Sequence, residues 1–141
     1  MLDDATKTRV SNYLGLAMGF FLSARPMTAP NEYDLRNSMS RLYYAFFHVS
    51  LAFLLSQGEP IERFRHSHGK VQTAIGKRMG KQLSRFVREI YQDRLRADYE
   101  PNFFSSRYAG NIEKARLDAH NMIKLANTNF YWIYQEARKV L

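Results

Sequence analysis

The chain of 141 residues is 45% hydrophobic and 14% aromatic, so it is long and apolar enough to bury a core, and intrinsic disorder is excluded. It contains no cysteine, which excludes disulfides, zinc–thiolate sites and thiol catalysis. Its formal net charge is +8, and a chain this basic is expected to meet phosphates or an acidic partner.

The first segment predicts an amphipathic helix over residues 4–23. Asp3 and Asp4 suit its start, because carboxylates interact favourably with the N-terminal end of the helix dipole. The apolar residues of one face, at helical spacing, are Val10, Tyr13, Leu14, Ala17 and Phe21. Two prolines within residues 25–30 remove backbone donors and end the pattern.

The second predicted helix runs from an Asn31 N-cap to Gly58, and the rest of the chain is organised around it. Residues 42–55 are apolar on nearly every side, so we expect other helices to surround them. One polar stripe interrupts the helix, and its members share a face at offsets of three and four: Asn37, Arg41, Tyr44 and His48. Buried polar groups need partners, so this stripe should meet carboxylates, a phosphate, water or a second subunit.

Two further helices are predicted after a charged loop over residues 59–66. Ser67 is a suitable cap for a short third helix that begins at His68, and Gly80 separates it from a fourth helix over residues 81–99. The inward face of the fourth helix extends to Arg94 and Asp98. An arginine there is expected to pair with Asp98 at i+4 or to reach a ligand.

Positive charge is concentrated between residues 63 and 96. Ten Lys and Arg residues lie there against Glu89 and Asp93, so this segment carries an excess equal to that of the whole chain. The ten are Arg63, Arg65, Lys70, Lys77, Arg78, Lys81, Arg85, Arg88, Arg94 and Arg96. Such a segment is typical of a surface that meets phosphates or an acidic partner, and a solvated helix face is the alternative for any one residue.

A linker over residues 101–106 precedes the last predicted helix, and its two phenylalanines are expected to fold back onto the bundle. The last helix runs from about Tyr108 to Lys139, with small and apolar residues at near-heptad spacing. No alternating strand pattern is present. We therefore predict an all-α fold, an up-and-down bundle of four or five helices, as a single domain over residues 1–141.

Neither a signal peptide nor a membrane span is predicted. The opening MLDDATKTRV lacks an apolar segment, and the apolar run of residues 42–55 is shorter than the ~20 residues that a span needs. We expect a cytoplasmic protein with no membrane association.

Three motifs carry a family resemblance. They are SRLYYAFFH at residues 40–48, a Ser-His pair at residues 67–68, and RLRADY at residues 94–99. In this order and spacing they resemble the HEPN domain family, in its branch of short stand-alone proteins, over most of the chain. The resemblance implies a helical bundle that forms a homodimer, often encoded beside a minimal nucleotidyltransferase as a toxin and antitoxin pair. Many members of the wider family are metal-independent ribonucleases.

The nuclease members resemble one another in an arginine followed, after four to six residues, by a histidine. Here Arg94 is followed at that spacing by Tyr99. Histidine titrates near neutrality and can exchange a proton with the ribose 2′-hydroxyl, whereas tyrosine, with a pKa of ~10, is a poor base at cellular pH. The inherited nuclease motif is therefore not intact.

A composite catalytic site is one alternative. Arg41 and His48 share a helical face, and His68 and Arg94 would join them across the bundle or a dimer interface. In this hypothesis His48 or His68 is the acid and base, and the two arginines hold the phosphate and stabilise its charge. The structural alternative makes His48 a hydrogen-bonded core histidine and Arg94 with Asp98 a buried ion pair.

The function that we expect is binding of RNA or a nucleotide by the toxin component of such a pair, with metal-independent endoribonuclease activity left open. The further contact residues in this hypothesis are Tyr44, Lys70, Arg78, Lys81, Asp98 and Tyr99. The partners would be a second copy and a nucleotidyltransferase antitoxin, and no cofactor or metal is expected. The alternative is a non-catalytic helical module that dimerises and docks an acidic protein partner.

Overall fold

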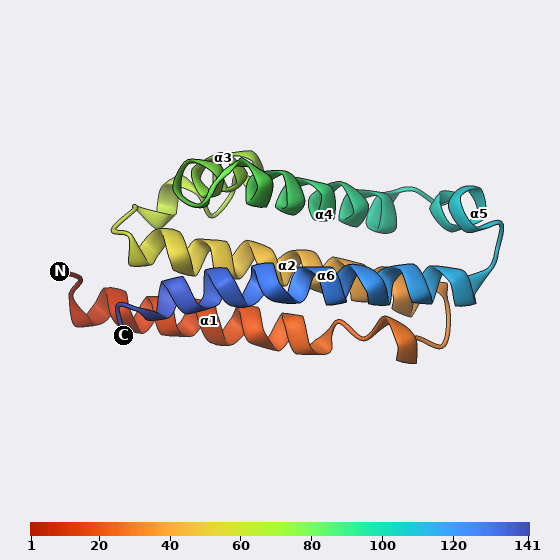
Figure 1. The fold of residues 1–141 in the computed structure, drawn as a ribbon, viewed down its shortest axis with the longest axis horizontal. Helices are drawn as coiled ribbons and strands as arrows, with labels where there is room; N and C mark the ends of the chain where they lie inside the picture. Colours follow the sequence, from red (N-terminus) through yellow and green to blue (C-terminus); the bar gives the residue numbers. More distant parts are fainter.

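The computed structural model describes all 141 residues and contains helices but no strand. The helices are α1 (Asp4–Ser23), α2 (Glu32–Ser56), α3 (His68–Met79), α4 (Lys81–Tyr99), α5 (Phe103–Tyr108) and α6 (Ile112–Arg138), with 3₁₀ turns at Pro26–Thr28 and Ile61–Arg63. Figure 1 shows α1, α2, α4 and α6 side by side, each running opposite to the one before it. The predicted all-α, up-and-down bundle is confirmed, with six helices where four or five were predicted.

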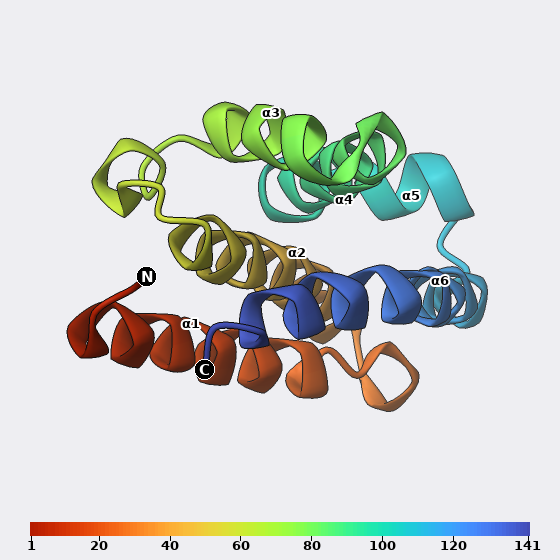
Figure 2. The same cartoon turned by 60° about the vertical axis from the view of Figure 1, so that its left-hand side comes forward.

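The central helix is α2. It packs against α1, α3, α4 and α6, and Figure 2 shows it between α1 and the α3–α4 pair. Between Leu42 and Ser56 every residue is buried except Tyr44 and His48, which are partly exposed. Other helices surround this segment, which explains why residues 42–55 are apolar on nearly every side. Most of them belong to the main core cluster of 27 buried residues.

Three helices begin where their capping residues predict. The side chains of Asp3, Asn31 and Ser67 each accept a hydrogen bond from the backbone N–H three residues later, at 2.7, 3.0 and 3.3 Å. Each bond satisfies a donor that the first turn of a helix leaves without a partner. Gly80, with φ of 106°, separates α3 from α4 as predicted, because this conformation is costly for residues with a Cβ atom.

The prediction for residues 101–106 is wrong in part. They contain most of the short helix α5 rather than an irregular linker, while Phe103 and Phe104 are buried as predicted. The two rings belong to a second apolar cluster of nine residues. Six residues are too few to show a helical period in the sequence, so the apolar pattern gave no sign of this helix.

The predicted start of the last helix is also wrong, by four residues. Tyr108 ends α5, and α6 begins only at Ile112. Ala109 and Gly110 have φ of 49° and 76°, which interrupts the helical backbone. The side chain of Asn111 then accepts a hydrogen bond from the backbone N–H of Lys114 at 3.1 Å and caps the new helix.

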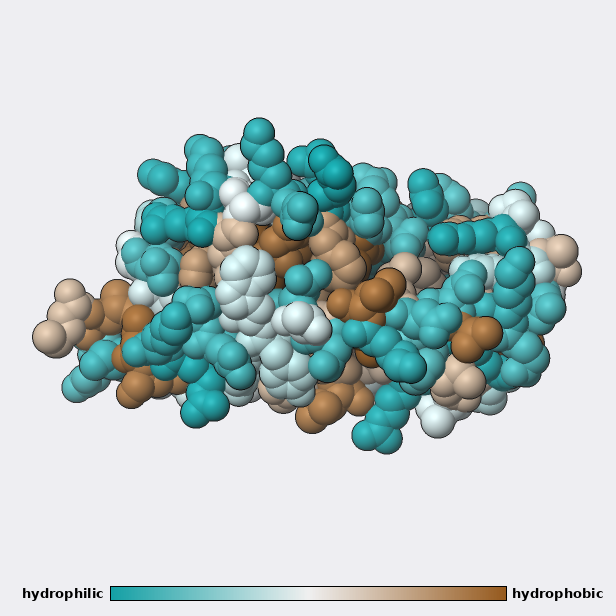
Figure 3. Space-filling view, in the orientation of Figure 1, coloured by the Kyte–Doolittle hydropathy of each residue, from teal (hydrophilic) through white to brown (hydrophobic).

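In Figure 3 hydrophilic side chains cover the region over α3 and α4, and apolar atoms show between that region and α6. No helix combines the length and the apolar character that crossing a membrane requires.

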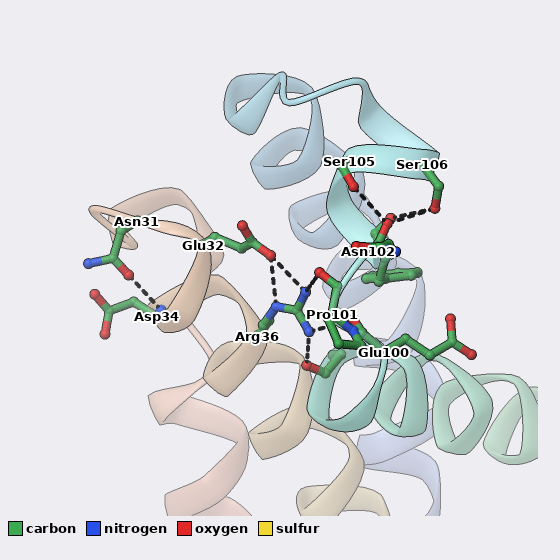
Figure 4. Close-up of polar contacts among 11 residues, drawn as sticks. Asn31, Glu32, Asp34, Arg36, Glu100, Pro101, Asn102, Ser105 and Ser106 are labelled. Carbon is green, nitrogen blue, oxygen red and sulfur yellow. Dashed lines mark hydrogen bonds and ion pairs between the residues drawn. The ribbon is translucent and has the colours of Figure 1, made fainter.

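Arg36 connects the start of α2 to the end of α4. Its Nη1 donates to the backbone carbonyls of Ala97 at 2.6 Å and Glu100 at 3.0 Å, and its Nη2 donates to that of Pro101 at 3.1 Å. Glu32 pairs with the same guanidinium at 2.7 Å (Figure 4). Ala97 lies in the last turn of α4, and Glu100 and Pro101 follow the helix directly, so Arg36 fixes the C-terminal end of α4 beside α2.

Candidate functional site

The strongest concentration of unpaired charge lies in a hollow of about 440 Å³ between α3 and α4. Seven residues line it: Thr73, Gly76, Lys77, Lys81, Ser84, Arg85 and Arg88. Four of the seven are cationic, and none is acidic or apolar. None of the four cations forms an ion pair within the chain. The hollow therefore carries positive charge that no carboxylate of the chain compensates, and this charge would attract an anion.

The close approach of α3 and α4 builds this hollow. A Cβ atom added at Gly76 would lie 3.0 Å from the Cβ of Ser84, so a glycine is needed for the two helices to pack at this distance. The Ser84 hydroxyl also donates to the backbone carbonyl of Gln72 at 2.9 Å. These contacts bring the cations of α3 and α4 to one surface.

A second basic hollow, of about 430 Å³, adjoins the first. Both are lined by Thr73 and Lys77, so the two form one continuous surface. The second adds Arg63, Lys70 and Arg78 to its lining, together with Glu59, which forms an ion pair with Arg78. We call the two hollows together the basic surface; it contains the predicted contact residues Lys70, Arg78 and Lys81.

A separate cluster forms around Arg94, which is only 9% exposed. Its Nη2 donates to the hydroxyl of Tyr44 at 2.9 Å. Its Nε lies 2.8 Å from Oδ2 of Asp98, although the N–H is not directed along a hydrogen bond, so the contact is an ion pair. The guanidinium carbon lies 5.2 to 5.7 Å from the ring centres of Tyr43, Tyr44 and Tyr99. The predicted Arg94–Asp98 pair is confirmed.

His68 belongs to the same cluster. Its ring lies 5.0 Å from that of Tyr91 and stacks on it, and its Nδ1 is hydrogen-bonded to the Tyr43 hydroxyl. Burial, and then the charge of Arg94, lower the pKa of His68 below its usual range. Burial also raises the pKa of Tyr43, so this phenol is neutral at cellular pH. A neutral His68 with only Nε2 free for a substrate is suited to exchange one proton.

His48 lies beside this cluster on α2. Its Nδ1 donates to the backbone carbonyl of Tyr44 at 2.7 Å, which leaves Nε2 as an acceptor when the ring is neutral. The ring stacks on Phe20 of α1 at 5.3 Å. Burial lowers the pKa of His48, so the ring is neutral at cellular pH. These contacts match a hydrogen-bonded core histidine and leave one nitrogen able to accept a proton.

The four predicted catalytic residues do not all come together. His68 and Arg94 both contact Tyr43, and His48 adjoins them through Tyr44. Arg41 lies elsewhere, near the end of α1, where its Nη1 is 3.4 Å from the carbonyl of Ser23. The other predicted contact residues divide in the same way, because Tyr44, Asp98 and Tyr99 surround Arg94 and not the basic surface.

Three cations of the first hollow were not among the predicted contact residues. They are Lys77, Arg85 and Arg88. One signal was present in the sequence, since Lys81, Arg85 and Arg88 stand at offsets of four and three and so share the outer face of α4. Lys77 joins these cations only because α3 packs close to α4, and the spacing of residues along one helix does not reveal this.

No three histidine or carboxylate side chains come together in a way that would hold a metal ion. No protein-family model matches the chain, and neither a curated protein nor a solved structure matches it.

Proposed function

We propose that this protein binds RNA or a nucleotide through the basic surface of α3 and α4. The observation that carries the proposal is the hollow between these helices, where four cations stand together without a carboxylate partner. Unpaired cations that converge on a concave surface repel one another, and a phosphate backbone would neutralise them.

Two features of the basic surface favour a nucleic acid over a small metabolite. The two hollows adjoin, so they offer charge over a longer path than one phosphate group occupies. The first hollow contains no apolar or aromatic side chain on which a base could stack. Contacts between cations and phosphates hold the RNA backbone without distinguishing its bases, so binding should depend strongly on salt and weakly on base composition.

Endoribonuclease activity is the second part of the proposal, and the cluster around Arg94 supports it. Two neutral histidines adjoin Arg94 through its tyrosine neighbours, His68 beside Tyr43 and His48 beside Tyr44. Arg94 lies thirteen residues after Lys81 on the same helix, which is about 20 Å along its axis. Arg94 lies on the inward face of α4 and the cations on its outer face, so a strand held on the basic surface would have to pass around α4 to reach the cluster. In this proposal the protein is the HEPN-like toxin of a toxin–antitoxin pair, a cytoplasmic homodimer paired with a nucleotidyltransferase.

The test of binding is the fluorescence anisotropy of a labelled RNA, titrated with the wild type and with Lys81→Ala/Arg85→Ala. The matched control is Lys114→Ala/Lys124→Ala, which removes two exposed cations from α6. We expect weaker binding only in the first variant. Equal binding by all three proteins would show that the basic surface does not hold RNA.

The test of catalysis is incubation of the same RNA with purified protein in the presence of a chelator. Cleavage that leaves cyclic-phosphate ends, and that is lost in folded His48→Ala or His68→Ala, would support a metal-independent nuclease. Cleavage that persists in both variants would exclude a catalytic role for either histidine.

A non-catalytic interaction module is the second candidate function. Large apolar side chains are exposed along α6, with Leu117 at 51%, Leu125 at 73% and Trp132 at 43%. Such side chains are typical of a protein contact, and the basic surface would then dock an acidic partner. Binding of an acidic polypeptide such as polyglutamate, with no binding of RNA at equal salt, would favour this function.

A further inference from the structure

A third hollow, of about 220 Å³, lies at the corner where α1 ends and α2 begins. It is separate from the basic surface, since the two have no lining residue in common. The side chains that define its chemistry are Arg25, Thr28, Asp34, Ser38 and Arg41. The proposed function uses none of them in RNA binding, and Arg41 is the predicted site residue that the Arg94 cluster leaves out.

Ser38 is the first sign that this hollow accommodates a ligand. The residue is 3% exposed, and its buried hydroxyl has no hydrogen-bond partner in the protein. A buried hydroxyl without a partner is unfavourable, because it has given up its hydrogen bonds to water. Ser38 lines the hollow, so rotation of its side chain about χ1 would bring the hydroxyl to an acceptor placed there and restore the missing bond.

Two guanidinium groups border the same hollow. Arg25 and Arg41 are exposed, and neither forms an ion pair with a carboxylate. Their only hydrogen bonds run to backbone carbonyls at the end of α1, Leu22 at 3.1 Å and Ser23 at 3.4 Å. Those bonds position the side chains and leave most of their N–H groups free for an oxyanion.

Asp34 limits which oxyanion fits. It lines the hollow without an ion pair of its own, one turn before Ser38, and Arg41 follows Ser38 by three residues. On a helix these offsets correspond to about 6 Å and about 4.5 Å along the axis, so an anion bonded to Ser38 lies between the carboxylate and the guanidinium. A carboxylate repels a fully ionised oxyanion but accepts a hydrogen bond from a protonated oxygen. The second ionisation of phosphate and its monoesters occurs at about pH 6–7, so a form with a proton is present near neutral pH, whereas sulfate has no such form.

We propose that this corner, defined by Arg25, Asp34, Ser38 and Arg41, is a binding site for a single phosphate group. The two guanidiniums neutralise its charge, the Ser38 hydroxyl donates to one oxygen, and the protonated oxygen donates to Asp34. The phosphate is either free inorganic phosphate or the phosphate of a monoester. This site does not depend on the proposed function, because its residues lie apart from the basic surface.

The experiment measures phosphate binding by isothermal titration calorimetry in the Lys81→Ala/Arg85→Ala background, which weakens binding at the basic surface. The titrants are inorganic phosphate, glycerol phosphate and sulfate at matched ionic strength. We expect one saturable site, with phosphate or the monoester bound at least tenfold more tightly than sulfate. Preference between the first two identifies the source of the phosphate.

Variants make the assignment specific. Arg25→Ala/Arg41→Ala should abolish binding, whereas Lys114→Ala/Lys124→Ala should not change it. Asp34→Asn should reduce the preference for phosphate over sulfate several-fold. Ser38→Ala should weaken binding several-fold without lowering the Tm of the unliganded protein, because the hydroxyl that it removes has no partner. The last result separates a ligand contact from a structural role.

Three results would overturn the proposal. They are the absence of saturable binding, equal affinity in Arg25→Ala/Arg41→Ala, and equal affinity for phosphate and sulfate in a protein that retains Asp34. None of them bears on RNA binding at the basic surface, so the proposed function stands or falls separately.

Discussion

Replacing Arg94 and Asp98, singly and together, tests whether their ion pair holds α4 in register against α2. Arg94 is nearly buried, and the Asp98 side chain is 24% exposed. Breaking a fully buried pair costs about 3–5 kcal/mol, because the remaining charge loses its partner without regaining water. Partial exposure of Asp98 screens this pair, so we expect Asp98→Asn to cost about 1–2 kcal/mol.

Arg94→Met should cost somewhat more, about 2–3 kcal/mol, since it also removes the hydrogen bond to Tyr44 and the contacts with three tyrosine rings. In the double variant the carboxylate and the guanidinium are both absent. The sum of the two single-variant costs should therefore exceed the cost of the double variant by about 1 kcal/mol.

The assay is urea unfolding followed by circular dichroism, with the free energy of unfolding taken at constant m-value. A coupling energy near zero would contradict this reasoning. It would mean that the tyrosine rings alone hold Arg94 and that Asp98 is an ordinary surface carboxylate.

Three further predictions concern stability. Arg36→Lys should cost about 1–3 kcal/mol in urea unfolding, because an ammonium group cannot reproduce the forked contacts to the end of α4; unchanged stability would contradict the connecting role of Arg36. Gly76→Ala should lower the Tm through its clash with Ser84, whereas the control Gly69→Ala, with open space at its Cβ position, should not lower it. Burial lowers the pKa of folded His48 below the value of 6.5 for the unfolded chain, so between the two values the unfolded chain binds more protons than the folded one. The stability contributed by neutral His48 is therefore lost as the pH falls from 6.5 through the lowered pKa. Unfolding at pH 7.5 and pH 5 should show a smaller loss in His48→Phe than in the wild type, and an equal loss would refute this linkage.

The main helices are predictable from the sequence because residues next to each helix end mark where it begins and stops. The bounds of α1 and α4 agree with those predicted, since an acidic start, prolines and a glycine with positive φ mark them. Local signals fail near α5, where the helix is too short for a period and the break before α6 needs a non-glycine residue, Ala109, at positive φ.

The candidate site is less predictable, because it depends on contacts between helices. The polar stripe of α2 is continuous in sequence, yet its neighbours differ along its length. Arg41 lies beside the end of α1, whereas Tyr44 meets Arg94 of α4. Likewise, Lys77 joins the α4 cations only because Gly76 lets α3 approach Ser84. Spacing along one helix gives the face of a residue and not the element opposite it.

The measurement that tests the central claim most directly is the salt dependence of RNA binding. If the four cations of the first hollow contact four phosphates, the slope of log K against log salt should be about −2.8 for a single strand. Affinity would then fall about 50-fold between 50 and 200 mM salt. Lys81→Ala/Arg85→Ala should reduce the slope to about −1.4, and Lys114→Ala/Lys124→Ala should leave it unchanged. A slope near zero in the wild type, or an equal slope in all three proteins, would contradict an RNA-binding role for the basic surface.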